Sequence, residues 1–131
     1  MDISAAALRC TAQVCSAGFL SSQTALAADE VGTIYALWNA GSVTGGAKHI
    51  YFSSSPNGGE SWSAKVEVSS APPGVEHCFP AITASTAGDV RIAWMDTRMV
   101  DAQNHPLWNT FYRASTNGGA TWLPESQLSG P

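Results

Sequence analysis

The chain has 131 residues, and its 10 acidic side chains outnumber its 6 basic ones, which gives a formal charge of −4 at pH 7. This balance excludes an electrostatic nucleic-acid surface, because such a surface needs clustered lysine and arginine residues to neutralise phosphates. Hydrophobic residues make up 44% of the chain and charged residues only 12%, which argues against disorder, and the length suits one domain over residues 1–131.

The first residues contain two weak signals. Residues 7–13 could add an outer strand to a neighbouring sheet. Residues 14–28 resemble a signal peptide in their apolar character, but polar residues interrupt the run and Asp2 occupies the usual basic start. A signal peptide is therefore not expected, and the repeat described below also assigns Leu26 to a strand. No run is apolar for long enough to span a bilayer, so no membrane partner is expected.

The chain contains three cysteines, Cys10, Cys15 and Cys78. An odd number leaves at least one thiol unpaired in a monomer, so the cysteines do not form a disulfide framework. Two alternatives remain: a bridge between Cys10 and Cys15, or three cysteines that act as small buried apolar residues.

The rest of the sequence is two copies of one pattern. A shift of 56 residues places Trp38 on Trp94 without a gap, whereas the segment that follows matches at a shift of 60. The second copy therefore carries four extra residues after Trp94. The two copies run over about 22–70 and 78–128, and we expect each copy to be one structural unit.

Each copy contains four short runs of apolar residues separated by Gly, Pro, Asn or Ser, which is typical of β-strands joined by turns. The runs predict strands at 23–28, 33–38, 48–54 and 64–69, and at 80–85, 90–95, 108–114 and 123–128. No stretch shows a sustained 3.6-residue period. The expected fold is all-β, with two four-stranded antiparallel units of the kind that form propeller blades.

A Ser-x-Asn-x-Gly-x-(Ser/Thr)-Trp motif separates the third and fourth predicted strands of each copy. Its glycines permit positive φ, its asparagines can accept backbone N–H bonds, and its tryptophans are expected to pack between neighbouring sheets. The motif residues are Ser55, Asn57, Gly59, Ser61 and Trp62 in the first copy and Ser115, Asn117, Gly119, Thr121 and Trp122 in the second. The motif resembles the Asp-box, or bacterial neuraminidase (BNR) repeat, of sialidases and other Asp-box β-propellers, with Asn where that family usually has Asp.

The resemblance implies that the box is a structural turn, that the parent protein is secreted or extracellular, and that this chain supplies two blades where sialidases close six. Isolated repeats cannot bury both faces, so three alternatives follow. The chain assembles with copies of itself, it is a fragment of a larger parent, or it folds as an open two-sheet sandwich. We favour a homo-oligomer of three chains, because three pairs of blades would close a ring of six.

Candidate binding residues gather at the end of the sheets opposite the boxes. If the strands alternate in direction, the linker 70–77 and the loops 39–47 and 96–107 emerge there, and loops on a rigid scaffold usually carry function. The candidates are His77, Asp96, Arg98, Asp101, His105 and Trp108.

Three of these candidates have competing interpretations. Asp96 and Arg98, within a Trp-x-Asp-x-Arg stretch that many such repeats also show, form either a brace that holds the loop or a clamp in which Arg98 donates to an acidic sugar. Trp108 either stacks on a sugar ring or belongs to the core.

No cofactor or metal is predicted. Asp96, Asp101 and Asn104 bring together oxygen atoms of the kind that Ca²⁺ prefers, but their spacing fits no known loop, and the histidines fit no zinc spacing. The resemblance implies that sialidase chemistry needs three arginines, an acidic Asp and a Tyr activated by Glu, whereas this chain has four arginines and no Arg-Ile-Pro segment.

We therefore expect a non-catalytic repeat module that binds carbohydrate or protein through its long-loop face. The alternatives are a fragment or oligomeric form of an exo-sialidase-like glycoside hydrolase, and a repeat segment without activity of its own.

Overall fold

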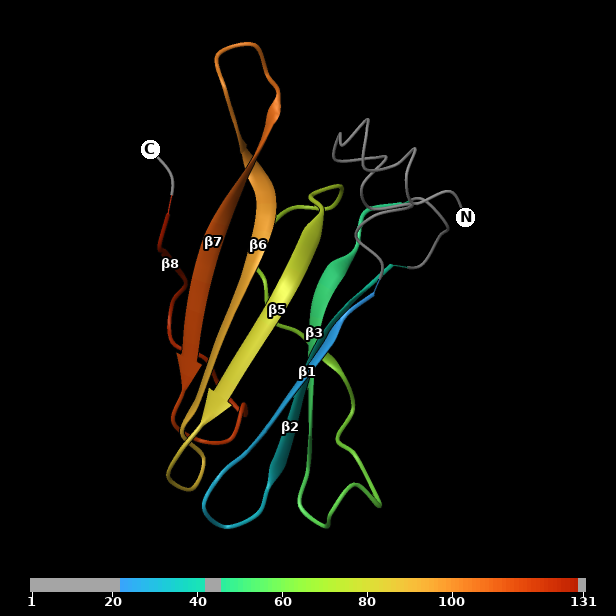
Figure 1. The fold of residues 1–131 in the computed structure, drawn as a ribbon, viewed down its shortest axis with the longest axis vertical. Coiled ribbons are helices and arrows are strands. Elements are labelled where there is room, and N and C mark those ends of the chain that lie inside the picture. Colours follow the sequence, from blue (N-terminus) through green and yellow to red (C-terminus); the bar gives the residue numbers. More distant parts are fainter. Residues whose placement is uncertain (1–21, 42–45, 130–131) are drawn as a thin grey trace.

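In the computed structural model, which describes residues 22–41 and 46–129, the chain forms two four-stranded antiparallel sheets that pack against each other (Figure 1). The first sheet contains β1 (Thr24–Ala28), β2 (Ile34–Ala40), β3 (His49–Ser55) and β4 (Val66–Glu67), in that order. The second contains β5 (His77–Ala84), β6 (Val90–Val100), β7 (Pro106–Ser115) and β8 (Ser126–Gln127), also in chain order. The described residues contain no helix, so the all-β prediction is confirmed.

Two sequence-based expectations fall outside the described residues. They are the outer strand at 7–13 and the bridge between Cys10 and Cys15. The signal-like segment 14–28 lies only partly within the described range, and its last residues, from Thr24, form β1.

The boundaries of the strands differ from the prediction at several places. The strand β5 begins at His77, three residues before its predicted start, and β2 runs to Ala40, two residues past its predicted end. The edge strands β4 and β8 are only two residues long, and beyond each of them the ladder continues through one further backbone bond, from Val68 N to Ile50 O and from Leu128 N to Thr110 O. In contrast, β6 and β7 are longer than expected, because they pair again after an irregularity between Asp96 and Met99. The predicted loop 96–107 is therefore wrong: most of it is a hairpin that projects beyond the sheets (Figure 1).

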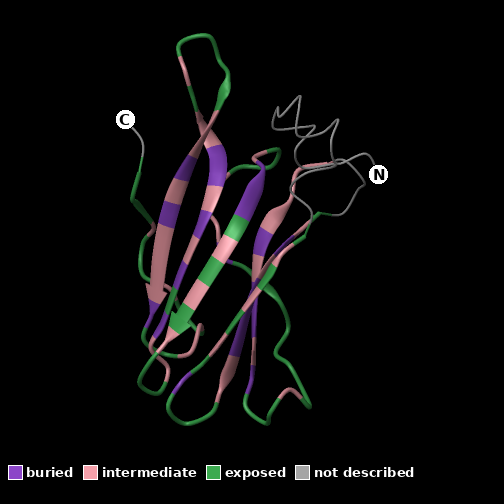
Figure 2. Ribbon diagram, viewed as in Figure 1, coloured by how far each residue is buried: buried purple, intermediate pink, exposed green. Residues whose placement is uncertain are grey.

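One core lies between the two sheets. Alternate residues of β2 and β3 point into it, and they meet alternate residues of β6 and β7. The residues are Tyr35, Leu37, Ile50 and Phe52 from the first sheet and Val90, Ile92, Trp94 and Phe111 from the second. Along β5, exposed and partly buried residues alternate, as expected for a strand with one face on the core and one face turned outward (Figure 2).

The two sheets are equivalent copies stacked in the same sense. Trp38 pairs with Tyr51 in the first sheet, and Trp94 pairs with Phe111 at the matching place in the second. Trp94 and Phe111 point into the core, whereas Trp38 lines a hollow on the face of the first sheet that is turned away from it. The two sheets are therefore stacked face to back, so that the inner face of the second sheet corresponds to the outer face of the first.

Candidate functional site

The end of the sheets opposite the boxes, which we call the loop end, is formed by the linker 68–76 and the hairpin 97–105. The hairpin arises because the second copy carries four extra residues at this place. Its counterpart in the first copy is the connection between β2 and β3, which has 8 residues between Ala40 and His49 where the second copy has 12 between the matching Asp96 and Asn109.

At the base of this hairpin, the buried Asp96 forms an ion pair with the partly buried Arg98. The Asp96 carboxylate has no exposed surface and accepts hydrogen bonds from Trp94 Nε1 at 3.0 Å and from Arg98 Nη2 at 2.6 Å. Arg98 Nη2 also donates to Glu125 Oε1 at 2.8 Å, and its guanidinium carbon lies 3.8 Å from the centre of the Phe111 ring. Burial opposes the charge on Arg98, but the hydrogen bonds to the two carboxylates outweigh it and raise the pKa of the guanidinium. This geometry is that of a brace.

His77 lies in the same buried cluster and links the two sheets. Its Nδ1 lies 2.7 Å from the carbonyl oxygen of Lys48 and 2.9 Å from that of Val75, and its Nε2 lies 2.8 Å from Ser69 Oγ. Because carbonyl oxygens only accept hydrogen bonds, Nδ1 carries the proton and Nε2 accepts from the Ser69 hydroxyl. Burial lowers the pKa of His77, which keeps the ring neutral, although Asp96 Oδ2 lies 3.8 Å from Nε2.

Asp101 and His105 lie together at the tip of the hairpin. Asp101 Oδ1 accepts the backbone N–H groups of Gln103 at 2.9 Å and His105 at 2.8 Å, and Oδ2 lies 3.1 Å from His105 Nδ1. These bonds hold a turn in which Asn104 has a φ of 64°. The backbone bond from His105 is the main reason that the pKa of Asp101 is lowered. The Asp101 carboxylate thus serves as the cap of its own turn.

The oxygen-bearing residues weighed above for Ca²⁺, Asp96, Asp101 and Asn104, are not brought together. Asp96 faces Arg98 inside the core, whereas Asp101 caps the tip. Among residues 22–41 and 46–129, no three His, Cys, Asp or Glu side chains converge in a way that could hold a metal ion.

Trp108 lies away from this polar cluster. It alternates with the buried inward-facing Asn109, and together with Met95 it packs on the fully buried Cys78. Burial, and then the nearby Glu76 carboxylate, raises the pKa of the Cys78 thiol to about 12. Since the thiolate is the nucleophilic form, Cys78 is a packing residue and not a reactive one.

Three features of the loop end were not predicted. Glu125 completes the brace from a distant part of the chain. Glu76 is buried, and among the described residues its Oε2 has no hydrogen-bond partner. Phe79 has a φ of 53° and is 48% exposed, at a register shift between Cys78 and Ala81. A proline inside an apolar strand pattern, such as Pro80, is a sequence signal for an edge strand or a bulge.

The two boxes at the other end are built by the same bonds. Ser55 Oγ accepts the N–H of Gly59 at 2.9 Å, and Asn57 Oδ1 accepts the N–H of Ser61 at 2.9 Å. The second box repeats both bonds, at 2.9 and 3.0 Å. In each box the asparagine Nδ2 also donates to the hydroxyl of the following Ser or Thr.

The box tryptophans differ in their surroundings, contrary to the prediction that both pack between sheets. Trp122 meets Phe52 of the first sheet edge to face, with ring centres 4.9 Å apart. Trp62 is 44% exposed, because among the described residues no second sheet packs on this side of the first sheet. Its Nε1 donates to Gly59 O within its own box.

No family model matches the chain, and no curated protein matches it either. The Asp-box relationship is therefore a resemblance that rests on the two motifs. In the part of the chain that the structure describes, no helix is long and apolar enough to cross a membrane.

Proposed function

We propose that this chain is a sialidase-like Asp-box β-propeller repeat module that is not catalytic alone and that binds carbohydrate or protein through its loop end. The observation that carries the proposal is the contrast between the two ends of the sheets. The same serine and asparagine bonds hold the box turns of both copies, whereas at the loop end β6 and β7 of the second copy extend a hairpin beyond their sheet. A constant scaffold with one elaborated end is the usual arrangement of a binding protein.

The arginines of the described residues support a role without catalysis. Arg98 is held by two carboxylates in the core, and Arg113 donates to the carbonyl oxygens of Val68 and Leu123. Arg91 is exposed near Asp89 on the other face of the second sheet. These guanidinium groups do not converge on one place, so they do not form the carboxylate-binding triad that sialidase chemistry would need.

The test is binding to a glycan array and to a protein array, combined with turnover of a fluorogenic sialoside. We expect glycan binding by the full chain and no turnover above the uncatalysed rate. Trp108→Ala should weaken binding by about 2- to 10-fold, because the contact of an aromatic ring contributes roughly 0.5 to 1.5 kcal/mol beyond the area that it buries. The matched control is Leu123→Ala, an exposed apolar residue near the box end, which should bind as the wild type does.

Each other result would count against the proposal. Turnover would favour the glycosidase alternative, and silence on both glycan and protein arrays would favour a repeat segment without a ligand. Circular dichroism must show that Trp108→Ala keeps its β-structure, since Trp108 also covers Cys78.

A further inference from the structure

The outer face of the first sheet is apolar, like a face that packs in a core. This face, which we call the first outer face, is the side of β1, β2 and β3 turned away from the second sheet, and it surrounds an apolar hollow of about 520 Å³. Leu26 is 63% exposed there and Trp62 is 44% exposed. A soluble chain rarely leaves such a contiguous apolar surface without a partner.

The register shows what kind of surface this is. Residues of the first outer face occupy the same ladder positions as core residues of the second sheet: Ala36 corresponds to Ile92 and Trp38 to Trp94. Trp62 likewise corresponds to Trp122 in the aligned boxes. The first outer face is therefore the equivalent of the surface with which the second sheet packs on the first.

The outside of the second sheet is the matching half. This second outer face presents Tyr112 and Ala93, which occupy the ladder positions of the core residues Phe52 and Leu37. A shallow apolar hollow of about 150 Å³ lies beside the Tyr112 ring.

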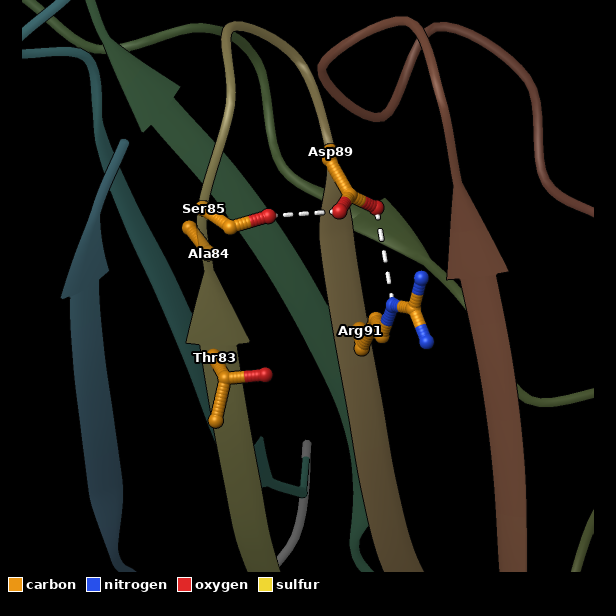
Figure 3. Close-up of a pocket in the computed structure, with 5 residues that line it drawn as sticks. All are labelled: Thr83, Ala84, Ser85, Asp89 and Arg91. Carbon is orange, nitrogen blue, oxygen red and sulfur yellow. Dashed lines mark hydrogen bonds and ion pairs between the residues drawn. The ribbon is translucent and has the colours of Figure 1, made fainter. Parts of the chain in front are cut away.

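A polar rim closes the second outer face at the box end, on the turn between β5 and β6 (Figure 3). Asp89 accepts a hydrogen bond from Ser85 Oγ at 2.6 Å and lies 3.5 Å from Arg91 Nε. An apolar centre with a polar rim is the usual composition of a protein interface.

We propose that the first outer face docks on the second outer face of a second copy of this chain, in the way that the second sheet docks on the first within one chain. Trp62 of one copy then lies on Tyr112 of the next copy, as Trp122 lies on Phe52. We choose a second copy as the partner because the equivalents of both faces already pack against each other within one chain, where the second sheet meets the first. The inference shares one premise with the proposed function, namely that the two repeats are equivalent, but it does not depend on any ligand.

This contact is heterologous, since two different surfaces of the same chain meet. Such contacts continue until they close into a ring or grow into a fibre. They differ in this way from a two-fold contact between two copies of the first outer face, which would stop at a dimer.

Two complementary variants test the proposal by solution mass. Leu26→Glu blocks the first outer face, and Tyr112→Glu blocks the second. The full chain should form species larger than 13.7 kDa that grow with concentration, and each variant alone should be a monomer. A one-to-one mixture of the variants should recover a dimer, because each still has one intact face. Val100→Glu, which changes an exposed apolar residue at the hairpin, is the control and should assemble as the wild type does.

A monomeric wild-type chain would overturn the proposal, and so would a mixture of variants that stays monomeric. Assembly of Tyr112→Glu alone would indicate a symmetric contact through the first outer face and would also overturn it. If Leu26→Glu fails to fold by circular dichroism, Trp62→Ser replaces it. The same samples are applied to the glycan array, so that a monomer that still binds glycan overturns the docking but not the proposed function.

Discussion

At the scale of single residues, the close approach of the second box to the first sheet depends on Gly119. Gly119 and Gly59 occupy matching box positions, with φ values of 87° and 92°. A Cβ atom at Gly119 would overlap the ring of Phe52, whereas one at Gly59 would meet only its own Trp62, at 3.8 Å. The two glycines thus share a backbone requirement and differ in the neighbour they meet.

We expect Gly119→Ala to destabilise the chain more than Gly59→Ala does. Both changes place alanine at positive φ, which costs about 1 kcal/mol. Gly119→Ala adds an overlap in a packed core, which costs about 1 to 3 kcal/mol more. The measurement is the free energy of unfolding in urea, in the monomeric Leu26→Glu background, so that assembly does not contribute. Equal losses for the two variants would show that the box does not press on Phe52.

At the scale of the structural elements, each box is a turn held by one asparagine. Asn117 Oδ1 accepts the N–H of Thr121 at 3.0 Å, while Nδ2 donates to Thr121 Oγ1 at 2.7 Å. The usual aspartate of the Asp-box family would keep the first bond, and the second would reverse so that the hydroxyl donates to the carboxylate. Asn at this position can therefore hold the same turn that Asp would hold.

The two asparagine bonds lead to a graded prediction. Asn117→Asp should change the free energy of unfolding by less than about 0.5 kcal/mol, because both bonds can still form. Asn117→Ala should lower it by about 1 to 2 kcal/mol, because the Thr121 N–H loses its acceptor. Thermal and urea unfolding of the two variants provide the measurement. A loss for Asn117→Asp as large as that for Asn117→Ala would mean that the turn needs a neutral side chain.

Local patterns predicted the strands but not where the longer ones end. Apolar alternation depends only on neighbours along the chain, so it placed all eight strands. Whether β6 continues past Asp96 depends on whether β7 pairs with it again, as Met99 does with Leu107, and no alternation in the sequence signals that pairing.

In the candidate site, the contact between residues close in sequence could be predicted, but the contact with a distant residue could not. The Trp-x-Asp-x-Arg spacing indicated a brace between Asp96 and Arg98 as one alternative, and their geometry is that of a brace. Its third member, Glu125, lies 27 residues after Arg98 and reaches it only because the sheet brings β8 close. The exposed state of Trp62 was missed because it depends on what stands beside the first sheet.

At the scale of the whole molecule, the buried His77 couples the packing of the two sheets to pH. It belongs to β5 of the second sheet, and its Nδ1 donates to the carbonyl oxygen of Lys48, next to β3 of the first. The groups that face it are His49, whose ring stacks at 5.7 Å, Asp96 within the second sheet and the hydroxyl of Ser69. Protonation of Nε2 would remove the acceptor of the Ser69 hydroxyl and place a charge in the core.

We expect the chain to lose stability as the pH falls below about 6.5. The pKa of His77 in the folded chain lies below its ordinary value of 6.5, so in this range the unfolded chain binds the proton and the folded chain does not. The free energy of unfolding therefore falls with decreasing pH, by at most about 1.4 kcal/mol per unit, until the folded pKa is reached. The carboxyl groups with lowered pKa values titrate in a more acidic range, below about 4.5. In His77→Gln, whose amide can still donate to the Lys48 carbonyl, the slope between pH 6.5 and 5 should decrease. Urea unfolding at several pH values measures it, and equal slopes for both proteins would show that His77 is not the group responsible.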